Sequence, residues 1–551
     1  MCLQGGAQRR SKTASGDVAA KAGRVAANSP LAREIGALLA EPAVARAHWG
    51  VMVTGMDGAP IYGVNEGQLF QPASNAKLFT TSAAMALLGG STTFETRVVA
   101  KGVMSGVGSL AGDLVLVGGG DANLSGRTIP YVAPAMRPKA VAGGAPLEKP
   151  DALRYLAAMA DQVAATGLKV VNGDVVGDDT LFPWEPYAED WVIDDTVWGF
   201  GAPVSALTVN DNQVVVTAGP GTVVGSAGVV TVDPVVPGYY VVDASGLVTD
   251  AAKSGSHVQM ERALGGKVLR VYGSIAVDAA PDVEEVAIHD PAEYAAMALK
   301  GMLESRGLVV TGVARARHRL PTDADGFITG LKRSGTEDEF VRTGIQRGSC
   351  LMTPPLEGRE HILASHQSPA LVDDVTVTNK VSQNLHAELL LHDLGRRSYC
   401  GKGSTVEGAR LVRAFLTVKV GIDPEDFVFY DGSGLSGHDL VTPRATVRLL
   451  QYAARDPKTG TAQPWFADWK KSLPVGGEDG SLIARFGKTP LKDHVFAKTG
   501  TLGEARALSG YLECASGRTV IFSIMVGNHT PGSNADREAM DKIVGAIAAR
   551  N

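Results

Sequence analysis

The chain has 551 residues, 45% of them hydrophobic, which predicts two or more globular domains because one hydrophobic core seldom organises so long a chain. The formal net charge of −6 and the dispersed lysines and arginines exclude a basic nucleic-acid-binding surface, and no apolar run of about 18 residues predicts a spanning helix. The cysteines are widely separated, so they predict neither a disulfide framework nor a zinc site. They are Cys2, Cys350, Cys400 and Cys514.

The N-terminal part of the chain predicts a pair of strands that leads into a helix. Residues 48–68 favour two short strands around an Asp57-Gly58 turn. An apolar-periodic run then predicts a helix from Ser74 to about Leu88. Residues 1–30 lack the apolar stretch of a secretory signal, and their small, polar composition predicts a disordered or processed terminus.

Residues 96–364 read as mostly β. Strand-like runs alternate with glycine-rich turns, and helices are expected only near 151–166 and 291–306. The runs are "TRVVAKGVM", "GDLVLVGGGD", "GDVVGDDTLF", "LTVNDNQVVVTAG" and "GVVTVDPVV". Residues 136–150, rich in Gly, Ala and Pro, predict a surface loop. We expect this region to be an insert of two subdomains.

Helical periodicity returns from about Pro369. The predicted helices are "PALVDDVTVTNKV", "SQNLHAELLLHDLG", "STVEGARLVRAFLTVKVG" and "TPRATVRLLQYAA", followed by the strands "DHVFAKTGTL", "ARALSGYLECAS" and "RTVIFSIMVGN" and a closing helix, "ADREAMDKIVGAIAAR". Residues 31–95 and 365–551 are therefore predicted to form one α/β domain that the β-rich insert splits.

Ser74 opens two interpretations. A serine just before an apolar-periodic run is a common helix N-cap. A capping box, however, would place Glu or Gln three residues on, and Lys77 stands there, a cation in a first turn where the helix dipole disfavours it. The alternative is chemical: Ser-x-x-Lys on one helix face lets an amine accept the proton of a hydroxyl nucleophile. A lone match is weak, so partners must decide.

Two further motifs supply partners. Ser382-Gln383-Asn384 lies at a junction between two predicted helices, where a hydroxyl and an amide can face one cleft, although a helix cap is again the simpler interpretation. Lys498-Thr499-Gly500 lies on a predicted strand, where Gly lets a ligand approach the backbone. The same letters at Lys458-Thr459-Gly460 fall in a turn, so we assign that copy to a loop.

The order Ser-x-x-Lys, Ser-x-Asn, Lys-Thr-Gly is the motif set of serine β-lactamases and penicillin-binding proteins. The sequence resembles one branch, the class C low-molecular-mass penicillin-binding proteins, D-alanyl-D-alanine carboxypeptidase/endopeptidases. Further matching stretches are "QPASNAKLFTTSAA", "FGAPVSALTVNDN", "DGSGLS", "SLPVGGEDGSLIARF" and "AKTGTLGEARALSGYL". About 300 residues separate Lys77 from Ser382, which fits the insert of this branch and fits class A β-lactamases poorly.

The resemblance implies a multidomain α/β fold in which a β-lactamase/transpeptidase-like domain, an antiparallel sheet flanked by helices plus a helical lobe, is split by the large β-rich insert. It also implies the roles of individual residues. Ser74 would attack the carbonyl of the penultimate D-alanine, Lys77, kept neutral by burial and by the nearby Lys498 cation, would be its base, and Ser382 would relay the proton to the leaving D-alanine beside both lysines. Substrate would be held by Asn384, Lys498, Thr499, Gly500 and Thr501, and the backbone N–H groups of Ser74 and Thr501 would form an oxyanion hole. β-Lactams are expected to acylate Ser74.

The resemblance also implies where stem-peptide side chains bind. An acidic residue from the insert contacts the free amine of the peptide stem in this family, and Asp195, beside Asp194, stands at the matching position; a solvated loop carboxylate is the simpler alternative. After "DGSGLS" the family usually continues with Arg and then Asn-Leu, whereas this chain has Gly437-His438-Asp439-Leu440. The absent Arg weakens carboxylate recognition there and suggests another stem-peptide preference.

Two other functions stay open at this point. One is an esterase or β-lactamase on the same scaffold, and the other is a catalytically silent cell-wall-binding protein. A Ser-His-Asp hydrolase is disfavoured because Ser74 has no G-x-S-x-G elbow. His386 and His392 do not share a helix face, so we expect no metal and no cofactor. A peptidoglycan substrate implies a periplasmic or cell-envelope location, so we expect a signal encoded upstream of Met1.

Overall fold

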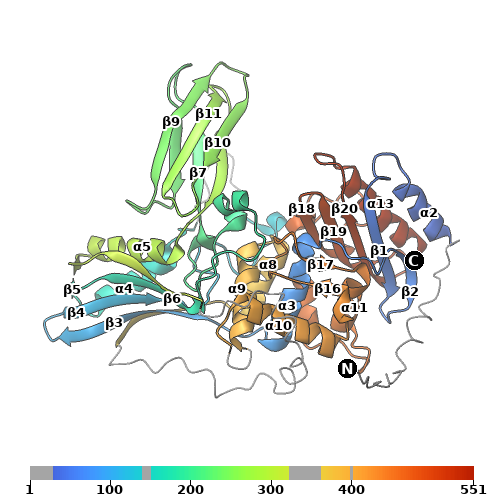
Figure 1. Ribbon diagram of the computed structural model, residues 1–551, viewed down its shortest axis with the longest axis horizontal. Coiled ribbons are helices and arrows are strands. Elements are labelled where there is room, and N and C mark those ends of the chain that lie inside the picture. The colour runs from blue at the N-terminus through green and yellow to red at the C-terminus, as the bar shows by residue number, and fades with distance from the viewer. Residues whose placement is uncertain (1–28, 139–149, 322–360, 398–400) are drawn as a thin grey trace, which may run out of the picture.

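A five-stranded antiparallel sheet carries the two ends of the described chain. The computed structural model describes residues 29–138, 150–321, 361–397 and 401–551. The sheet has the order β18-β19-β20-β1-β2, so the N-terminal pair lies beside the three C-terminal strands (Figure 1). These strands are β1 (His48–Gly55), β2 (Pro60–Val64), β18 (Val495–Leu502), β19 (Ala505–Glu513) and β20 (Thr519–Gly527). The predicted strand pair and the three consecutive strands are confirmed.

Helices cover both faces of this sheet. On one face α2 (Pro30–Leu39) and α13 (Ala535–Arg550) share a core with inward residues of β1 and β20; Leu31 of α2 and Ile543 of α13 belong to this core. On the other face α3 (Ala76–Leu87) and α11 (Pro443–Ala454) pack against β19 and β20 in a second core. The layered arrangement buries the apolar side of each element, as an α/β domain requires.

A helical lobe completes the second core. Its helices lie next to α3 in the middle of the molecule (Figure 1). They are α8 (Leu371–Lys380), α9 (Asn384–Arg397), α10 (Thr405–Ala414) and α12 (Phe466–Ser472). A short strand pair, β16 (Phe427–Val428) with β17 (Leu440–Val441), brackets the loop that contains "DGSGLS". The predicted antiparallel sheet with flanking helices and a helical lobe is confirmed.

The region between α3 and α8 adds three further sheets. The largest has seven strands. Five follow the order β13-β5-β4-β3-β15, and β6 also pairs with β4 and carries β14 on its other side. Two helices, α4 (Arg154–Ala165) and α5 (Pro291–Ser305), pack on this sheet. Its strands are β3 (Glu95–Ser105), β4 (Ser109–Val117), β5 (Val170–Asn172), β6 (Val175–Pro183), β13 (Val309–Val310), β14 (Ala314–Arg319) and β15 (His361–Gln367). The expectation that this region is mostly β is confirmed.

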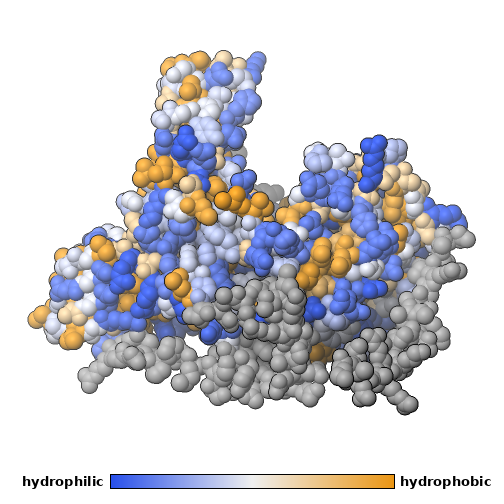
Figure 2. Space-filling view, viewed as in Figure 1, coloured by the Kyte–Doolittle hydropathy of each residue, from blue (hydrophilic) through white to orange (hydrophobic). Residues whose placement is uncertain are grey.

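Two three-stranded sheets form a lobe that projects from the rest of the molecule (Figure 1). One consists of β7 (Gln213–Gly219), β8 (Val229–Asp233) and β12 (Asp282–Ala287), the other of β9 (Val241–Asp250), β10 (Ser256–Glu261) and β11 (Val268–Ala276). Large apolar side chains stay exposed along this lobe, among them Val229, Val241 and Val268, and orange residues mark it in Figure 2.

One predicted strand begins later than expected. Residues 207–219 were expected to be extended throughout, but β7 starts at Gln213, and Asn210, Asp211 and Asn212 form a turn with φ of 49°, 54° and 53°. Asn and Asp tolerate this left-handed region better than other residues with a Cβ. The strand prediction was therefore wrong for residues 207–212, which precede the strand.

The chain enters and leaves the inserted region side by side. β3 and β15 are antiparallel, with Glu95 opposite Gln367. We propose that residues 31–95 and 365–551 form the catalytic domain and residues 96–364 an insert of two subdomains. The N-terminal prediction for residues 1–28, the core of the predicted loop at 139–149, and Cys2, Cys350 and Cys400 lie outside the described residues. Cys514 is buried and free.

Candidate active site

Ser74 lies in a single 3-10 turn, η1 (Ala73–Asn75), directly before α3. The preceding Ala73 has φ of 45°, a left-handed conformation that is strained for a residue with a Cβ. The turn is fixed from the sheet, because Asn75 Nδ2 donates to Ser509 Oγ at 2.7 Å. No side-chain cap bond forms at the start of α3. The cap interpretation of Ser74 is therefore wrong, and the strained turn presents its hydroxyl elsewhere.

The amine of Lys77 contacts three segments of the site: the turn of Ser74, the start of α9 and the loop that contains Ser433. Lys77 Nζ donates to Ser74 Oγ at 2.9 Å, to Asn384 Oδ1 at 2.6 Å and to the carbonyl oxygen of Ser433 at 2.7 Å. Lys77 follows Ser74 by three residues, about one helical turn, across the junction of η1 and α3, so the local backbone sets their distance. The structure thus brings together the first two predicted motifs.

Burial prepares Lys77 to act as a base. The residue has no exposed surface, and burial lowers the pKa of its amine to about 8 against the opposing effect of Asp431, Glu388 and Asp439. The expected cause was burial together with the Lys498 cation. Lys498 is not among the groups that shift the pKa of Lys77, whereas the charge of Lys77 does help to lower the pKa of Lys498.

Three buried carboxylates behind Lys77 were missed by the sequence analysis. Glu388 accepts from the backbone N–H of Gly432 and of Ser433, the residue whose carbonyl binds Lys77. Burial first, and then Asp431, raise the pKa of Glu388 to about 8. A signal existed, since Glu388 follows Asn384 by one helical turn and thus lies on the same face of α9.

The loop that faces Lys77 is held by an aspartate. Asp431 accepts from the N–H groups of Gly434 at 2.6 Å and Ser436 at 2.7 Å, and from Trp191 Nε1 at 3.0 Å. Gly434 is required, because its φ is 81° and a Cβ there would lie 1.9 Å from the carbonyl oxygen of Ala73. This loop therefore packs directly against η1, the turn that contains Ser74.

Ser382 and Asn384 come from the turn that starts α9. Ser382 has φ of 63°, and its hydroxyl accepts from Lys498 Nζ at 2.8 Å. Asn384 Nδ2 donates to the carbonyl oxygen of Phe200 at 2.9 Å, in the short helix η4 (Gly199–Gly201). Ser382 was expected between both lysines, but among the described hydrogen bonds it meets Lys498, and Lys77 meets Asn384 instead.

The Lys-Thr-Gly motif occupies the edge strand β18, beside the nucleophile turn. Lys498 is fully buried, with no carboxylate partner among the described residues, and burial lowers its pKa well below the ordinary value. Thr499 Oγ1 shares a 2.7 Å hydrogen bond with Ser481 Oγ, which the sequence analysis did not select. A Cβ at Gly500 would lie 2.5 Å from the carbonyl oxygen of Pro72 and 3.2 Å from Ser74 N, so glycine permits this approach.

The neighbouring Thr501, also on β18, is exposed to solvent. Its backbone follows Gly500, which packs against Ser74 N. The second Lys-Thr-Gly copy does not lie on a strand. Its Lys458 is an exposed turn residue after α11. The structure therefore groups Ser74, Lys77, Ser382, Asn384 and Lys498, and leaves Lys458 outside.

Asp195 lies in η3 (Ile193–Val197), close in sequence to Phe200. The carboxylate is half-buried and has no hydrogen bond or ion pair within the part of the chain that the structure describes; burial and then Asp194 raise its pKa. At the departure from the family pattern, His438 Nδ1 lies 3.5 Å from Asp190 Oδ2. Asp439 is buried and accepts from the N–H of Tyr430 at 2.6 Å.

The sequence profile of the D-Ala-D-Ala carboxypeptidase 3 (S13) family matches residues 31–324 and 336–550. The chain belongs to this family. A D-alanyl-D-alanine carboxypeptidase from Actinomadura sp. (strain R39) is 32% identical over 510 residues, 91% of this chain and 81% of the relative. D-alanyl-D-alanine carboxypeptidase DacB from Haemophilus influenzae is 24% identical over 467 residues, 84% of this chain and 81% of the relative.

Among solved structures, penicillin binding protein 4 (dacB) from Haemophilus influenzae superposes with a TM-score of 0.71 at 22% identity, over 93% of this chain and 98% of that one. This similarity shows the same fold across the S13 protein, insert included. The resemblance drawn from the motifs is confirmed. The protein is a hydrolase, a serine-type D-Ala-D-Ala carboxypeptidase of the S13 family.

Proposed function

We propose that this S13 protein cleaves the terminal D-alanine of peptidoglycan stem peptides, or the equivalent cross-link, through an acyl-enzyme on Ser74. The observation that supports it most directly is the 2.9 Å hydrogen bond between the buried Lys77 amine and the Ser74 hydroxyl. A lysine of lowered pKa beside a hydroxyl is an activated nucleophile. The other groups then supply binding and proton transfer.

In the first step, neutral Lys77 takes the proton from Ser74 Oγ as this oxygen attacks the carbonyl carbon of the penultimate D-alanine. The developing oxyanion accepts from the N–H groups of Ser74 and Thr501, which the close approach of Gly500 to Ser74 N supports. The C–N bond then breaks, and the leaving amine receives, through the Ser382 hydroxyl, the proton that Lys77 took from Ser74, which returns Lys77 to its neutral form. Water hydrolyses the ester and restores Ser74.

Lys498 and Thr499 are proposed to bind the terminal carboxylate of the substrate. Lys498 is a buried amine with no carboxylate partner among the described residues, so an arriving carboxylate supplies the missing counter-charge and favours its protonated form. Asn384 is proposed to orient the substrate amide. In the free enzyme its Nδ2 is held by Phe200, so the substrate would share or replace that bond.

β-Lactams present a strained amide beside a carboxylate, so we expect them to acylate Ser74. The test compares the wild type with Ser74→Ala, using labelled penicillin and release of D-alanine from a stem pentapeptide and from a cross-linked dimer. Loss of both signals in Ser74→Ala supports the proposal. Covalent labelling of Ser74→Ala would contradict it. Rapid penicillin turnover without D-alanine release would indicate a β-lactamase, and absence of any acylation a binding protein.

Asp195 is proposed to contact the free amine of the stem peptide. It is half-buried without a cationic partner within the described residues, which a substrate amine would provide. Asp195→Asn should raise KM for an amine-bearing peptide severalfold and leave penicillin acylation unchanged, with Asp194→Asn as the matched control. An unchanged KM in Asp195→Asn would make this carboxylate a surface group.

The proposed substrate places the enzyme in the bacterial cell envelope, and we propose the periplasmic side of it. Within residues 29–138, 150–321, 361–397 and 401–551, no helix combines the length and apolarity needed to cross a bilayer. Fractionation of cells that make the protein from its native locus tests the location, and recovery with the cytoplasmic fraction would contradict it.

A further inference from the structure

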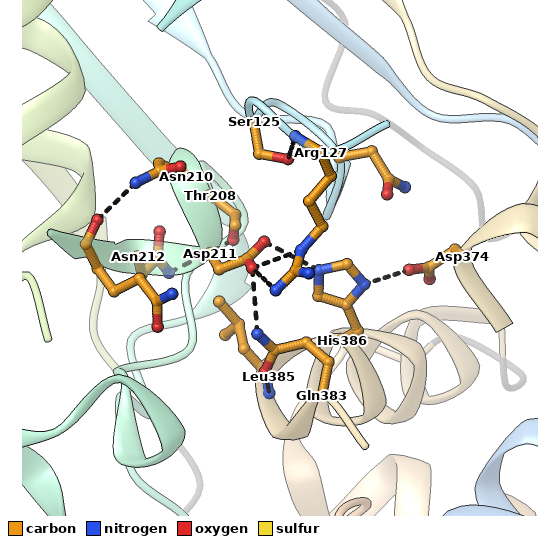
Figure 3. Close-up of polar contacts among 12 residues, drawn as sticks. Ser125, Arg127, Thr208, Asn210, Asp211, Asn212, Asp374, Gln383, Leu385 and His386 are labelled. Atoms are coloured by element: carbon orange, nitrogen blue, oxygen red, sulfur yellow. Dashed lines mark hydrogen bonds and ion pairs between the residues drawn. The ribbon is translucent and has the colours of Figure 1, made fainter. Parts of the chain in front are cut away.

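The middle residue of the Ser382-Gln383-Asn384 turn bonds to the inserted region. Gln383 Nε2 donates to Asp211 Oδ2 at 3.2 Å, and Gln383 Oε1 accepts from the N–H of Leu385 at 3.2 Å (Figure 3). One end of this side chain therefore fastens the start of α9, and the other end reaches an aspartate that lies about 170 residues earlier in the chain.

Asp211 is the centre of a buried network that crosses between the insert and the helical lobe. Its side chain is 4% exposed. Arg127 donates to Asp211 Oδ2 from Nε at 2.7 Å and from a second guanidinium nitrogen, and His386 Nε2 lies 3.2 Å from Asp211 Oδ1. Arg127 belongs to the insert, whereas His386 belongs to α9, one turn after Gln383 (Figure 3).

Charges alternate along this network. His386 Nδ1 lies 2.6 Å from Asp374 Oδ1 on α8. Burial by itself would lower the pKa of His386, but Asp374 and Asp211 raise it to about 9; burial would likewise raise the pKa of Asp211, but Arg127 and His386 hold it well below its usual range. Arg127 and His386 are therefore the counter-ions of Asp211, and buried ion chains of this kind seldom gain much stability over apolar packing.

The backbone is shaped to aim Asp211. Asn210, Asp211 and Asn212 all have left-handed φ values, a costly run for residues with a Cβ. Asn212 locks the turn, because its Oδ1 accepts from the N–H of Val209 at 3.0 Å and its Nδ2 donates to the carbonyl oxygen of Pro203 at 2.8 Å. A strained turn that is fixed on both sides and directs one carboxylate at another domain indicates a positioning role.

We propose that Asp211 is a positioning residue for the reaction, which the insert uses to hold the Ser382-Gln383-Asn384 turn in register with Lys77 and Lys498. The proposal rests on the proposed function. Two of the three turn residues bond to the insert, Gln383 through Asp211 and Asn384 through Phe200, while Ser382 bonds to Lys498. The insert thus sets the place of the catalytic turn in addition to any contact with substrate.

The test measures how fast penicillin acylates Ser74, with the limiting rate constant separated from the apparent binding constant in rapid-mixing experiments. Asp211→Asn should lower the limiting rate about tenfold or more, because small displacements of reacting groups have large effects on rate. Measurements are made well below the unfolding temperature of each variant, so that loss of folded protein does not enter the rate.

Asp178→Asn is the matched control. Asp178 is also a buried insert aspartate, 5% exposed, whose ion partner is an arginine, Arg317, and it has no hydrogen bond to the catalytic turn among the described contacts. Asp178→Asn should lower the unfolding temperature and keep the limiting rate within twofold of the wild type. Equal rate losses in both variants would overturn the proposal, because both would then report general loosening.

A second variant keeps the charges in place. Gln383→Leu removes the link between Asp211 and the turn together with the local bond that Gln383 accepts from the N–H of Leu385, so it should lower the limiting rate. Only the part of that loss that passes through Asp211 is shared, so the double variant with Asp211→Asn should lose less than the product of the two effects. Arg127→Lys, which keeps the positive charge, should retain more of the limiting rate than Arg127→Met. Independent, multiplying effects, or a rate within twofold of wild type in Gln383→Leu, would overturn the proposal.

These outcomes separate the two proposals. If penicillin fails to acylate the wild-type enzyme, the proposed function is wrong. If the wild type is acylated at Ser74 and Asp211→Asn reacts at the same limiting rate, the proposed function stands and the positioning role of Asp211 fails.

Discussion

The side-chain nitrogen of Lys77 donates a hydrogen bond of 2.9 Å to the hydroxyl oxygen of Ser74, and Lys77 is fully buried. The same nitrogen binds the Ser433 carbonyl, behind which Glu388 and Asp431 lie. Burial favours the neutral amine and the carboxylates favour the charged one, so the balance between them sets the pH at which Ser74 becomes reactive.

Acylation of Ser74 should rise with pH and reach its plateau above a midpoint near the Lys77 pKa of about 8, because only the neutral amine can accept the serine proton. Lys77→Met should lower the acylation rate by about 10²- to 10⁴-fold, the usual contribution of a general base. Rapid-mixing kinetics with penicillin between pH 6 and 10 measure both. A pH-independent rate in the wild type would exclude Lys77 as the base.

Glu388→Gln should move that midpoint to lower pH. The Glu388 carboxylate stabilises the Lys77 ammonium when ionised, so its removal lowers the Lys77 pKa, while the Gln oxygen can still accept from the loop N–H groups. The control is Glu425→Gln, at an exposed carboxylate, which should leave the profile unchanged. A shift to higher pH in Glu388→Gln contradicts the assigned electrostatics.

Substitution of the lysine should impair activity in one Lys-Thr-Gly copy and not in the other. Lys498→Ala removes the buried amine that contacts Ser382, so acylation and D-alanine release should fall about 100-fold or more. Lys458→Ala changes an exposed turn and should stay within twofold of the wild type. Comparable losses in both variants would refute the choice of Lys498.

Gly434→Ala should destabilise the enzyme by about 3 kcal/mol or more, because a Cβ would meet the Ala73 carbonyl oxygen at 1.9 Å in addition to the strain of φ 81°. The matched control is Gly460→Ala, with φ of 74° and no atom within 4 Å of the added Cβ, which should cost about 1 kcal/mol. Denaturant unfolding measures both free energies. Equal costs would show that strain alone matters and that the loop can move away from Ala73.

His386 should give the enzyme a stability that depends on pH. Its pKa is raised from 6.5 to about 9, so its contribution to the free energy of unfolding is fully present below about pH 6.5 and is lost as pH rises through 9. Unfolding measured from pH 6 to 10 should therefore fall less steeply in His386→Gln than in the wild type. His257→Gln, at an exposed site, should follow the wild type. An identical slope in His386→Gln would show that the buried imidazole is uncharged.

The catalytic motifs could be found from the sequence because their information is local. The Ser74 to Lys77 spacing is one helical turn, and the strand that carries Lys498 has apolar neighbours that set it apart from the turn at Lys458. The N-terminal strand pair and the three consecutive C-terminal strands also followed from local patterns, whereas the pairing of β20 with β1 joins distant parts of the chain and was not predicted. The start of β7 was missed, because three left-handed residues in succession follow from tertiary contacts and not from propensity.

What the sequence determined by itself was the family, the order of the elements and the residues of the three motifs, because each depends on residue types at short spacing. Only the tertiary structure decided which lysine meets which partner, which carboxylates lie behind Lys77, and that Asp211 of the insert reaches Gln383. Those relationships join residues that are tens to hundreds of positions apart, and packing and charge burial in the folded protein fix them.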